Sequence, residues 1–248
     1  MTKVLIVLSA ADKWTRADGS IYESGVWAQE FVDLDEAFVK AGYQVDLASP
    51  GGVIPTMDKK SLDPKVVGDD IADQMRSYLA SNAERIEQPL VLANIDTSTY
   101  DAVVVPGGHG PVEDLYKDPD MGRVLVEADK RSKVIAAVCH GPAALLAATD
   151  ADGQWPFAGR RMTSLTDEEE IEFGTADNAP WLLADTLRKK GAHFEQGRNW
   201  GTFVVTDGNL MTGQNPQSSS KLAEAVIGAL SATRADPAYS GSYPAALK

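Results

Sequence analysis

The chain has 248 residues, of which 44% are hydrophobic and 24% are charged, a composition typical of a globular protein. Its net charge of −13 disfavours binding to nucleic acid or to an anionic membrane surface. The single cysteine, Cys139, excludes an intrachain disulfide and favours a reducing compartment. The apolar run near the N-terminus is too short for a signal peptide or a membrane span, so we expect a cytoplasmic protein.

Along the chain, apolar runs typical of strands alternate with segments that have helical periodicity. In chain order we predict a strand over 3–9, a helix over 25–41, strands over 43–48 and 100–105, a helix over 119–131, a strand over 134–138, helices over 142–148 and 179–190, a hairpin of strands 202–206 and 210–212, and a helix over 216–230. The strands are apolar almost throughout, which indicates a parallel sheet covered on both faces. We therefore predict an α/β fold of the flavodoxin-like, doubly wound type, with a mainly parallel sheet and helices on both faces.

No linker or internal repeat divides the chain, so residues 1–231 are predicted to form a single domain. Residues 50–98 are more polar than their surroundings and are predicted to be an insertion or cap within that domain. Residues 232–248 lack hydrophobic periodicity and are predicted to be a loosely attached C-terminal tail.

The segment VIAAVCHGPAA joins a predicted strand directly to a helix-like stretch, with Cys139 at the junction. This pattern is typical of a nucleophile elbow, which raises one reactive side chain to the rim of an α/β sheet. A thiol at that position feels the positive end of the helix dipole, which favours the nucleophilic thiolate. His140 follows directly and is a candidate base, although the sequence alone does not establish a contact between the two side chains. The alternatives are a buried structural cysteine and a surface histidine.

Glu30 interrupts the apolar stripe of the first long helix, since it falls on or beside the face marked by Trp27 and Leu34. A carboxylate there is costly unless it is paired, protonated or used. Burial would raise its pKa toward neutrality and suit it to move a proton or to hydrogen-bond a thiolate. A glutamate that reaches solvent is the alternative, and Glu23 is a weaker candidate for the same work.

The loop PGGHG follows a strand directly, so it opens at the same sheet edge as Cys139. We predict that Gly107, Gly108 and His109 contact the substrate or stabilise an oxyanion, with a plain turn as the alternative. The run TDEEE is typical of a capped, acidic first turn of a helix, and one of its carboxylates could orient His140. The histidines show no metal-ligand spacing, so no metal is predicted.

These segments together resemble the DJ-1/PfpI superfamily, and more closely its Hsp31-like branch, over almost the whole chain up to about residue 230. The resemblance rests on KVLIVLS, SGVWAQEF, VVVPGGHGP, AAVCHGPAAL, SLTDEEE and NWGTFVVTDGNLMTGQNPQSS. It implies that Cys139 is the nucleophile, that His140 assists it, that Glu30 contacts the thiol and that Glu170 completes a Cys-His-Glu triad.

The resemblance also implies a glutathione-independent glyoxalase that needs no cofactor and acts as a homodimer. Such an enzyme converts methylglyoxal, or a related 2-oxoaldehyde, to D-lactate or the matching 2-hydroxy acid through a hemithioacetal on Cys139. Three other functions stay open: a holdase chaperone or protein deglycase in stress response, a redox sensor, and a cysteine hydrolase or isonitrile hydratase. Glutamine amidotransferase is disfavoured because the chain lacks the late His-Pro-Glu element that supplies the base in that class.

Overall fold

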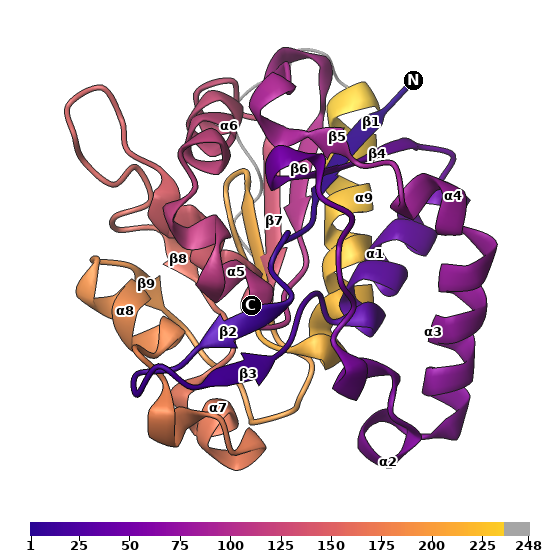
Figure 1. The fold of residues 1–248 in the computed structure, drawn as a ribbon. Helices are drawn as coiled ribbons and strands as arrows, with labels where there is room; N and C mark the ends of the chain where they lie inside the picture. The colour runs from indigo at the N-terminus through magenta and orange to yellow at the C-terminus, as the bar shows by residue number, and fades with distance from the viewer. Residues whose placement is uncertain (236–248) are drawn as a thin grey trace.

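A seven-stranded sheet forms the centre of the computed structural model, which describes residues 1–235 (Figure 1). In spatial order its strands are β10 (Val204–Asp207), β11 (Leu210–Gly213), β7 (Val134–Val138), β6 (Ala102–Val105), β1 (Lys3–Val7), β4 (Gln44–Ser49) and β5 (Leu90–Val91). All neighbouring strands run parallel except β10 and β11, which form an antiparallel hairpin. The predicted doubly wound, mainly parallel fold is therefore confirmed.

Both faces of the sheet are buried, as the continuous apolar strands predict. Successive side chains of β1 point to opposite faces: Val4 and Ile6 pack in one hydrophobic cluster, and Leu5 and Val7 in the other. Helices α1 (Ala28–Lys40) and α9 (Ser219–Ala235) lie side by side over the first face (Figure 1). Helix α6 (Pro119–Lys130) covers the second face together with a 3₁₀ segment at residues 141–147.

Shorter elements surround this core. They are the hairpin β2 (Lys13–Thr15) and β3 (Ile21–Glu23), the parallel pair β8 (Arg161–Met162) and β9 (His193–Phe194), and helices α2 (Pro64–Val67), α3 (Asp69–Ser81), α4 (Ala83–Ile86), α5 (Gly110–Glu113), α7 (Asp167–Phe173) and α8 (Leu183–Lys189). Among the described residues, no helix is long and apolar enough to cross a bilayer.

Several predicted boundaries differ from the structure; the helix predicted over 179–190, for example, is α8 over Leu183–Lys189. The helix predicted over 142–148 is a 3₁₀ segment over 141–147, and the last helix runs past residue 230 to Ala235. That helix takes in the first four residues of the predicted tail, and the rest of the tail lies outside the described residues. The predicted hairpin at 202–212 is confirmed, with its turn at Asp207 to Leu210.

The segment 50–98 contains α2, α3 and α4 and then supplies β5, the edge strand of the central sheet. Helix α3 packs beside α1. Leu92 and Ile95 join the core under α6. The segment is therefore built into both the sheet and the core, and its helices α2 and α3 lie beside α1 (Figure 1).

Candidate active site

Cys139 lies in the sharp turn that follows β7, with φ at +58°. A non-glycine residue in this left-handed region costs of order 1–3 kcal/mol and persists only where the surroundings enforce it. The Cys139 N–H donates to the Gly213 carbonyl at 3.0 Å, and the Cys139 carbonyl accepts from the Leu165 N–H at 2.9 Å. A Cβ on Gly141 would lie 2.2 Å from the Val105 carbonyl oxygen, so the turn needs glycine there. The strained elbow predicted from the sequence is therefore present.

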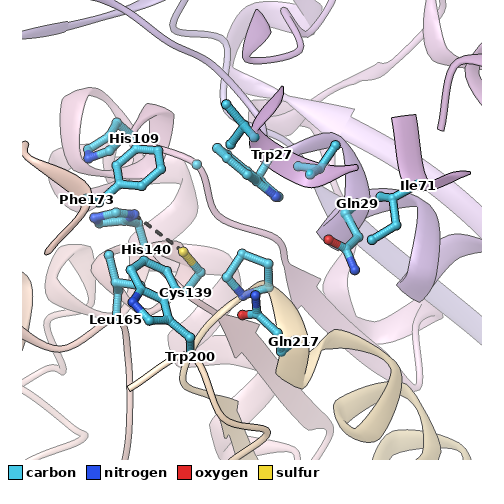
Figure 2. A pocket seen from close by; sticks show the side chains of 14 residues that line it. Trp27, Gln29, Ile71, His109, Cys139, His140, Leu165, Phe173, Trp200 and Gln217 are labelled. Atoms are coloured by element: carbon cyan, nitrogen blue, oxygen red, sulfur yellow. Dashed lines mark hydrogen bonds between the residues drawn. The ribbon is translucent and has the colours of Figure 1, made fainter. Parts of the chain in front are cut away.

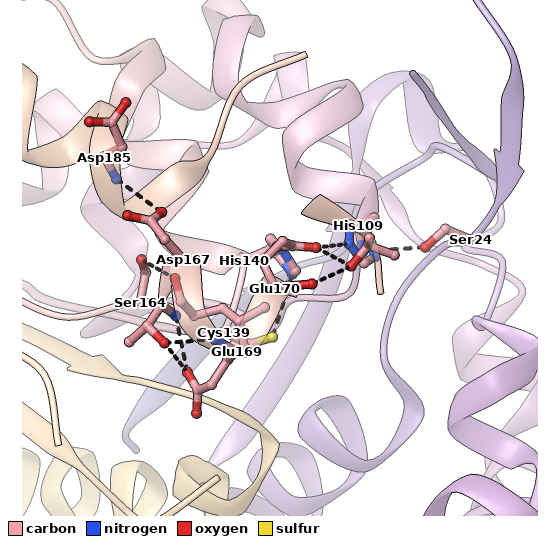
Figure 3. A network of polar contacts seen from close by, with 12 residues as sticks. Ser24, His109, Cys139, His140, Ser164, Asp167, Glu169, Glu170 and Asp185 are labelled. Carbon is pink, nitrogen blue, oxygen red and sulfur yellow. Dashed lines mark hydrogen bonds and ion pairs between the residues drawn. The ribbon is translucent and has the colours of Figure 1, made fainter. Parts of the chain in front are cut away.

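The His140 ring connects the thiol to a carboxylate (Figures 2 and 3). Its Nδ1 lies 3.5 Å from the Cys139 Sγ, and its Nε2 lies 2.6 Å from Glu170 Oε2. An ionised carboxylate only accepts hydrogen bonds, so it holds the proton on Nε2. The bare Nδ1 then faces the thiol and can accept its proton. Cys139, His140 and Glu170 thus have the geometry of a nucleophile, a base and a residue that orients the base.

Glu170 also holds a second imidazole, because the His109 Nε2 lies 2.7 Å from its other oxygen (Figure 3). The His109 ring stacks on Trp14 at 4.7 Å between centroids and lies 4.3 Å from the His140 ring. Burial lowers the pKa of His109, so this ring is neutral at pH 7. Burial alone would raise the pKa of Glu170, but the two imidazoles outweigh that effect and hold its pKa well below the ordinary value.

Glu30 approaches the thiol from the first turn of α1 and is fully buried. Its Oε2 accepts a hydrogen bond from the Gly107 N–H at 2.6 Å. Burial raises the pKa of Glu30 to about 8, against the smaller lowering effects of the Gly107 N–H and of the Cys139 thiol. The apolar stripe on α1 is confirmed, and the carboxylate that interrupts it lies at the Cys139 thiol.

Burial also raises the pKa of the Cys139 thiol well above its ordinary value, and the Glu30 carboxylate raises it further, while the Gly108 N–H lowers it. A protonated Glu30 no longer opposes ionisation of the thiol, because the repulsion between two negative charges is then gone. Burial thus favours the protonated form of both groups, and the thiolate forms when a base takes the thiol proton.

A cavity of about 370 Å³ opens over the Cys139 sulfur (Figure 2). Most of its wall is aromatic or aliphatic; His109 and His140 lie on the side of the thiol, and Gln29 lies beside Ile71 on the other side. It is lined by Trp27, Gln29, Val66, Val67, Ile71, Gly108, His109, Cys139, His140, Leu165, Phe173, Trp200, Pro216 and Gln217. A concave apolar site with a few converging polar groups is the usual form of a small-molecule site.

Comparison with known proteins matches residues 21–229 of the chain to the DJ-1/PfpI family, and this range includes Cys139, His140, Glu170 and Glu30. The chain belongs to the DJ-1/PfpI family. It is 30% identical to Glyoxalase 3 of Candida albicans, covering 92% of this chain and 98% of that protein. The crystal structure of glyoxalase III from Candida albicans superposes with a TM-score of 0.76 at 28% identity, over 92% of this chain and 97% of that one.

Two further relatives are similar over most of the chain. Glutathione-independent glyoxalase HSP31 of Saccharomyces cerevisiae is 29% identical, over 92% of this chain and 98% of the yeast protein. Protein/nucleic acid deglycase HchA of Staphylococcus aureus is 26% identical, over 91% of this chain and 78% of the bacterial protein. The resemblance stated from the sequence motifs is confirmed.

The structure of this DJ-1/PfpI member shows different roles for acidic residues that the sequence alone could not tell apart. Glu169 closes a capping box with Thr166, and its Oε1 accepts from the side-chain amides of Gln214 and Asn215. Glu169 therefore fixes the start of α7, while Glu170 faces the histidines. Glu23, the weaker alternative to Glu30, is exposed and pairs with Lys59 at the surface.

The prediction for the PGGHG loop is wrong for Gly107. The Gly107 N–H is engaged by Glu30, so it is not free to bind an oxyanion, whereas Gly108 lies at the cavity against the sulfur. His109 lines the cavity as predicted, but its bond to Glu170 was not foreseen. Ligand atoms of His109, His140 and Glu170 lie within 4.8 Å of one another, which the spacing of the histidines in the sequence did not indicate. Two imidazoles and a carboxylate are a donor set that could hold a transition-metal ion. The absence of a metal stays a prediction.

Sequence reasoning missed the residues that shape the site from outside the motifs. Trp14 and Tyr22 of the β2–β3 hairpin pack against the two sides of His109, one stacked and one edge-on. Val66 and Ile71 come from the segment predicted as a cap. The prediction of a cap could have indicated Val66 and Ile71. In contrast, no sequence pattern indicates that Trp14 and Tyr22, in a short hairpin, pack against His109.

Proposed function

We propose that the protein is a glutathione-independent glyoxalase that converts methylglyoxal, or a related 2-oxoaldehyde, to D-lactate or the matching 2-hydroxy acid. The observation that carries the proposal is the placement of two different proton-handling groups at one thiol. His140 presents its bare Nδ1 to the Cys139 sulfur, and Glu30 reaches the same sulfur from α1 with a pKa of about 8. The glyoxalases among its relatives support the assignment.

The first step uses the Cys139–His140–Glu170 chain. His140 Nδ1 accepts the thiol proton, and the charge on the new imidazolium is balanced by Glu170. The thiolate sulfur forms a bond to the aldehyde carbon, and the aldehyde oxygen takes up the proton to give a hemithioacetal. The Gly108 and His140 N–H groups are the proposed donors to the developing oxyanion.

The second step needs a group that removes a proton and returns it within one turnover. Glu30 would take the proton from the former aldehyde carbon and deliver it to the neighbouring carbon. The hydroxyl proton moves in the same sequence from the former aldehyde oxygen to the ketone oxygen, through an enediol. A pKa of about 8 suits this work, because both protonation states are accessible near neutral pH. The product is a thioester of the 2-hydroxy acid, and water cleaves it to release the acid and the thiol.

This sequence needs no external oxidant or reductant, since the aldehyde carbon is oxidised while the neighbouring ketone carbon is reduced. We therefore assign the protein to the lyase class that interconverts 2-oxoaldehyde and 2-hydroxy acid, without a cofactor. The role of His109 is to position Glu170, because the neutral ring donates to the oxygen that His140 leaves free.

The test is lactate formation from methylglyoxal in the absence of glutathione, for the wild type and for Cys139→Ser. We expect the wild type to form D-lactate and the variant to lose at least about 10³-fold in kcat, because serine is a far weaker nucleophile. Glu23→Gln, a surface carboxyl, is the matched control and should keep the wild-type rate. A wild type that makes no lactate, or a Cys139→Ser variant with its rate intact, refutes the glyoxalase assignment.

A protein deglycase is the second candidate, favoured by the similarity to HchA of Staphylococcus aureus. It would use the same sulfur on an aldehyde adduct already attached to an amine or thiol. Preformed methylglyoxal adducts of a cysteine peptide separate the two activities, provided that their spontaneous release of methylglyoxal is measured. Protection of a client protein against heat aggregation that survives Cys139→Ser would instead support a holdase chaperone.

We further propose a cytoplasmic homodimer that binds neither membranes nor nucleic acid stably. The net charge of −13 and the single cysteine support the location and the lack of anionic partners. Light scattering coupled to gel filtration tests the dimer, and a monomer at working concentration contradicts it.

A further inference from the structure

The cavity over Cys139 is larger than methylglyoxal requires. Its volume of about 370 Å³ falls in the range of roughly 300–1,000 Å³ that is typical of sites for drug-sized ligands. At about 30 Å³ per water molecule, methylglyoxal would leave room for several waters. Water retained against an apolar wall contributes little to binding, whereas a substrate group that displaces it gains affinity.

The apolar side of the cavity comes from the segment 50–98. Val66 and Val67 of α2 and Ile71 of α3 line it, and Figure 2 shows Ile71 on the opposite side of the cavity from His140. Val66 is 46% exposed although it is fully apolar, and it borders the same cavity as the thiol. An apolar wall that faces a reactive group, and that nothing covers within the described residues, is a surface suited to an apolar part of a ligand.

Aromatic rings also line the cavity, and Phe173 and Trp200 lie on the side of His140 (Figure 2). Trp27 and Phe173 meet edge-to-face with centroids 5.9 Å apart, and Phe173 lies 6.3 Å from the Trp200 ring. Among the residues that line the cavity in the described part of the chain, none is Lys or Arg. The wall therefore offers no cation to a carboxylate, and its apolar side chains outnumber its two amides, Gln29 and Gln217, which favours a neutral, apolar substituent.

We infer that the site is built for 2-oxoaldehydes R–CO–CHO in which R is an extended apolar group, alkyl or aryl, that lies against Val66, Val67 and Ile71. This inference rests on the proposed glyoxalase function and names its substrate class. The bonds made and broken are those of the methylglyoxal reaction, with water as the only co-reactant, and R takes no part in them. R contributes binding, and the dicarbonyl end stays at Cys139.

The experiment measures kcat/KM for a series of alkylglyoxals from methyl to pentyl, which changes R while the reacting groups stay the same. Each buried methylene is worth about 0.8 kcal/mol, so we expect kcat/KM of the wild type to rise about fourfold per methylene. A glyoxal of the same length ending in a carboxylate should lose this gain. Val66→Asn should lower the factor to about twofold per methylene, because an amide at this position no longer offers an apolar surface to R.

Val53→Asn is the matched control, because Val53 lies in the same segment and is 49% exposed, but it does not line the cavity. It should keep the wild-type dependence on chain length. If methylglyoxal is turned over but kcat/KM stays constant or falls with alkyl chain length, the inference is overturned and the glyoxalase assignment stands. The inference is also overturned if kcat/KM of Val66→Asn rises with chain length as strongly as that of the wild type. No turnover with any member of the series overturns both proposals.

Discussion

Helix α1 buries two carboxylates, Glu30 in its first turn and Asp35 further along, and neither side chain is exposed to solvent. Asp35 is bound by the Arg85 guanidinium through both oxygens and by the Tyr78 hydroxyl at 2.7 Å. Within residues 1–235, Glu30 forms no salt bridge, and it accepts a backbone hydrogen bond from Gly107. Its Oε1 lacks a nitrogen or oxygen partner within the described residues.

The difference shows how one helix carries a structural charge and a reactive one. The paired and hydrogen-bonded Asp35 carboxylate fixes α1 to the segment that holds Tyr78 and Arg85. A buried carboxylate without a cation is held near the point of protonation, so it can exchange a proton with the thiol beside it. Three predictions test this division, beginning with the largest effect.

Glu30→Gln should lower kcat for methylglyoxal by about 10²- to 10⁴-fold, because the amide cannot accept the carbon-bound proton. Since Glu30 must be ionised to act as a base, wild-type kcat should rise with pH and level off above about pH 8. The residual rate of Glu30→Gln should lack this rise. Steady-state kinetics from pH 5 to 9 measure both effects, and a variant with the wild-type pH profile would show that Glu30 is not the titrating base.

Glu30→Gln should also stabilise the folded protein at alkaline pH. Burial raises the pKa of Glu30 from 4.5 to about 8, so between these values the folded state binds a proton that the unfolded state lacks. The free energy of unfolding of the wild type therefore falls as pH rises through this window. Relative to the wild type, the variant should gain little at pH 4.5 and about 4 kcal/mol, as an order of magnitude, above pH 8.

Denaturant unfolding of both proteins at pH 5 and pH 8.5 measures this gain. The control is Glu23→Gln, which changes an exposed carboxyl and should move stability by less than about 0.5 kcal/mol at either pH. A stability difference between Glu30→Gln and the wild type that does not depend on pH would contradict the raised pKa.

Asp35→Asn should lower stability and leave activity almost unchanged, the reverse of Glu30→Gln. Its energetic effect should be the smallest of the three. Removing one partner of a buried pair costs about 3–5 kcal/mol, and the lower value applies here because the Arg85 side chain keeps 32% exposure to solvent. Activity per folded molecule should stay within about threefold of the wild type at 25 °C. Denaturant unfolding and methylglyoxal kinetics on the same sample check this, and a large loss of kcat in the folded variant would place Asp35 in the reaction.

Much of the site could be predicted from the sequence because its parts follow local rules. A thiol between a buried strand and a tight turn, and a carboxylate in a helical apolar stripe, both interrupt a short-range pattern, so Cys139 and Glu30 stood out. Asp35 is as deeply buried as Glu30, yet it was not singled out, because its partner Arg85 lies fifty positions away. The helix pattern alone does not show which buried carboxylate is paired.

The same limit applies to the acidic run at the start of α7. The sequence indicated an N-cap followed by an acidic first turn, and the structure has Thr166 as the N-cap, in a capping box with Glu169. Which glutamate faces His140 depends on how α7 is placed over the ends of β6 and β7, and that placement is set by contacts with residues 198–215. The meeting of His109 with Glu170 follows from the same placement.

By itself, the sequence determined the alternating elements, the doubly wound sheet, the elbow at Cys139 and the unusual position of Glu30, because each depends on periodicity or on turn geometry within a short stretch. The tertiary structure decided which groups share the thiol's surroundings: the Gly107 N–H engaged by Glu30, the two histidines on Glu170, and the apolar wall from α2 and α3. These contacts join residues far apart in the chain, and their chemistry depends on burial and on charges that only the folded chain brings together.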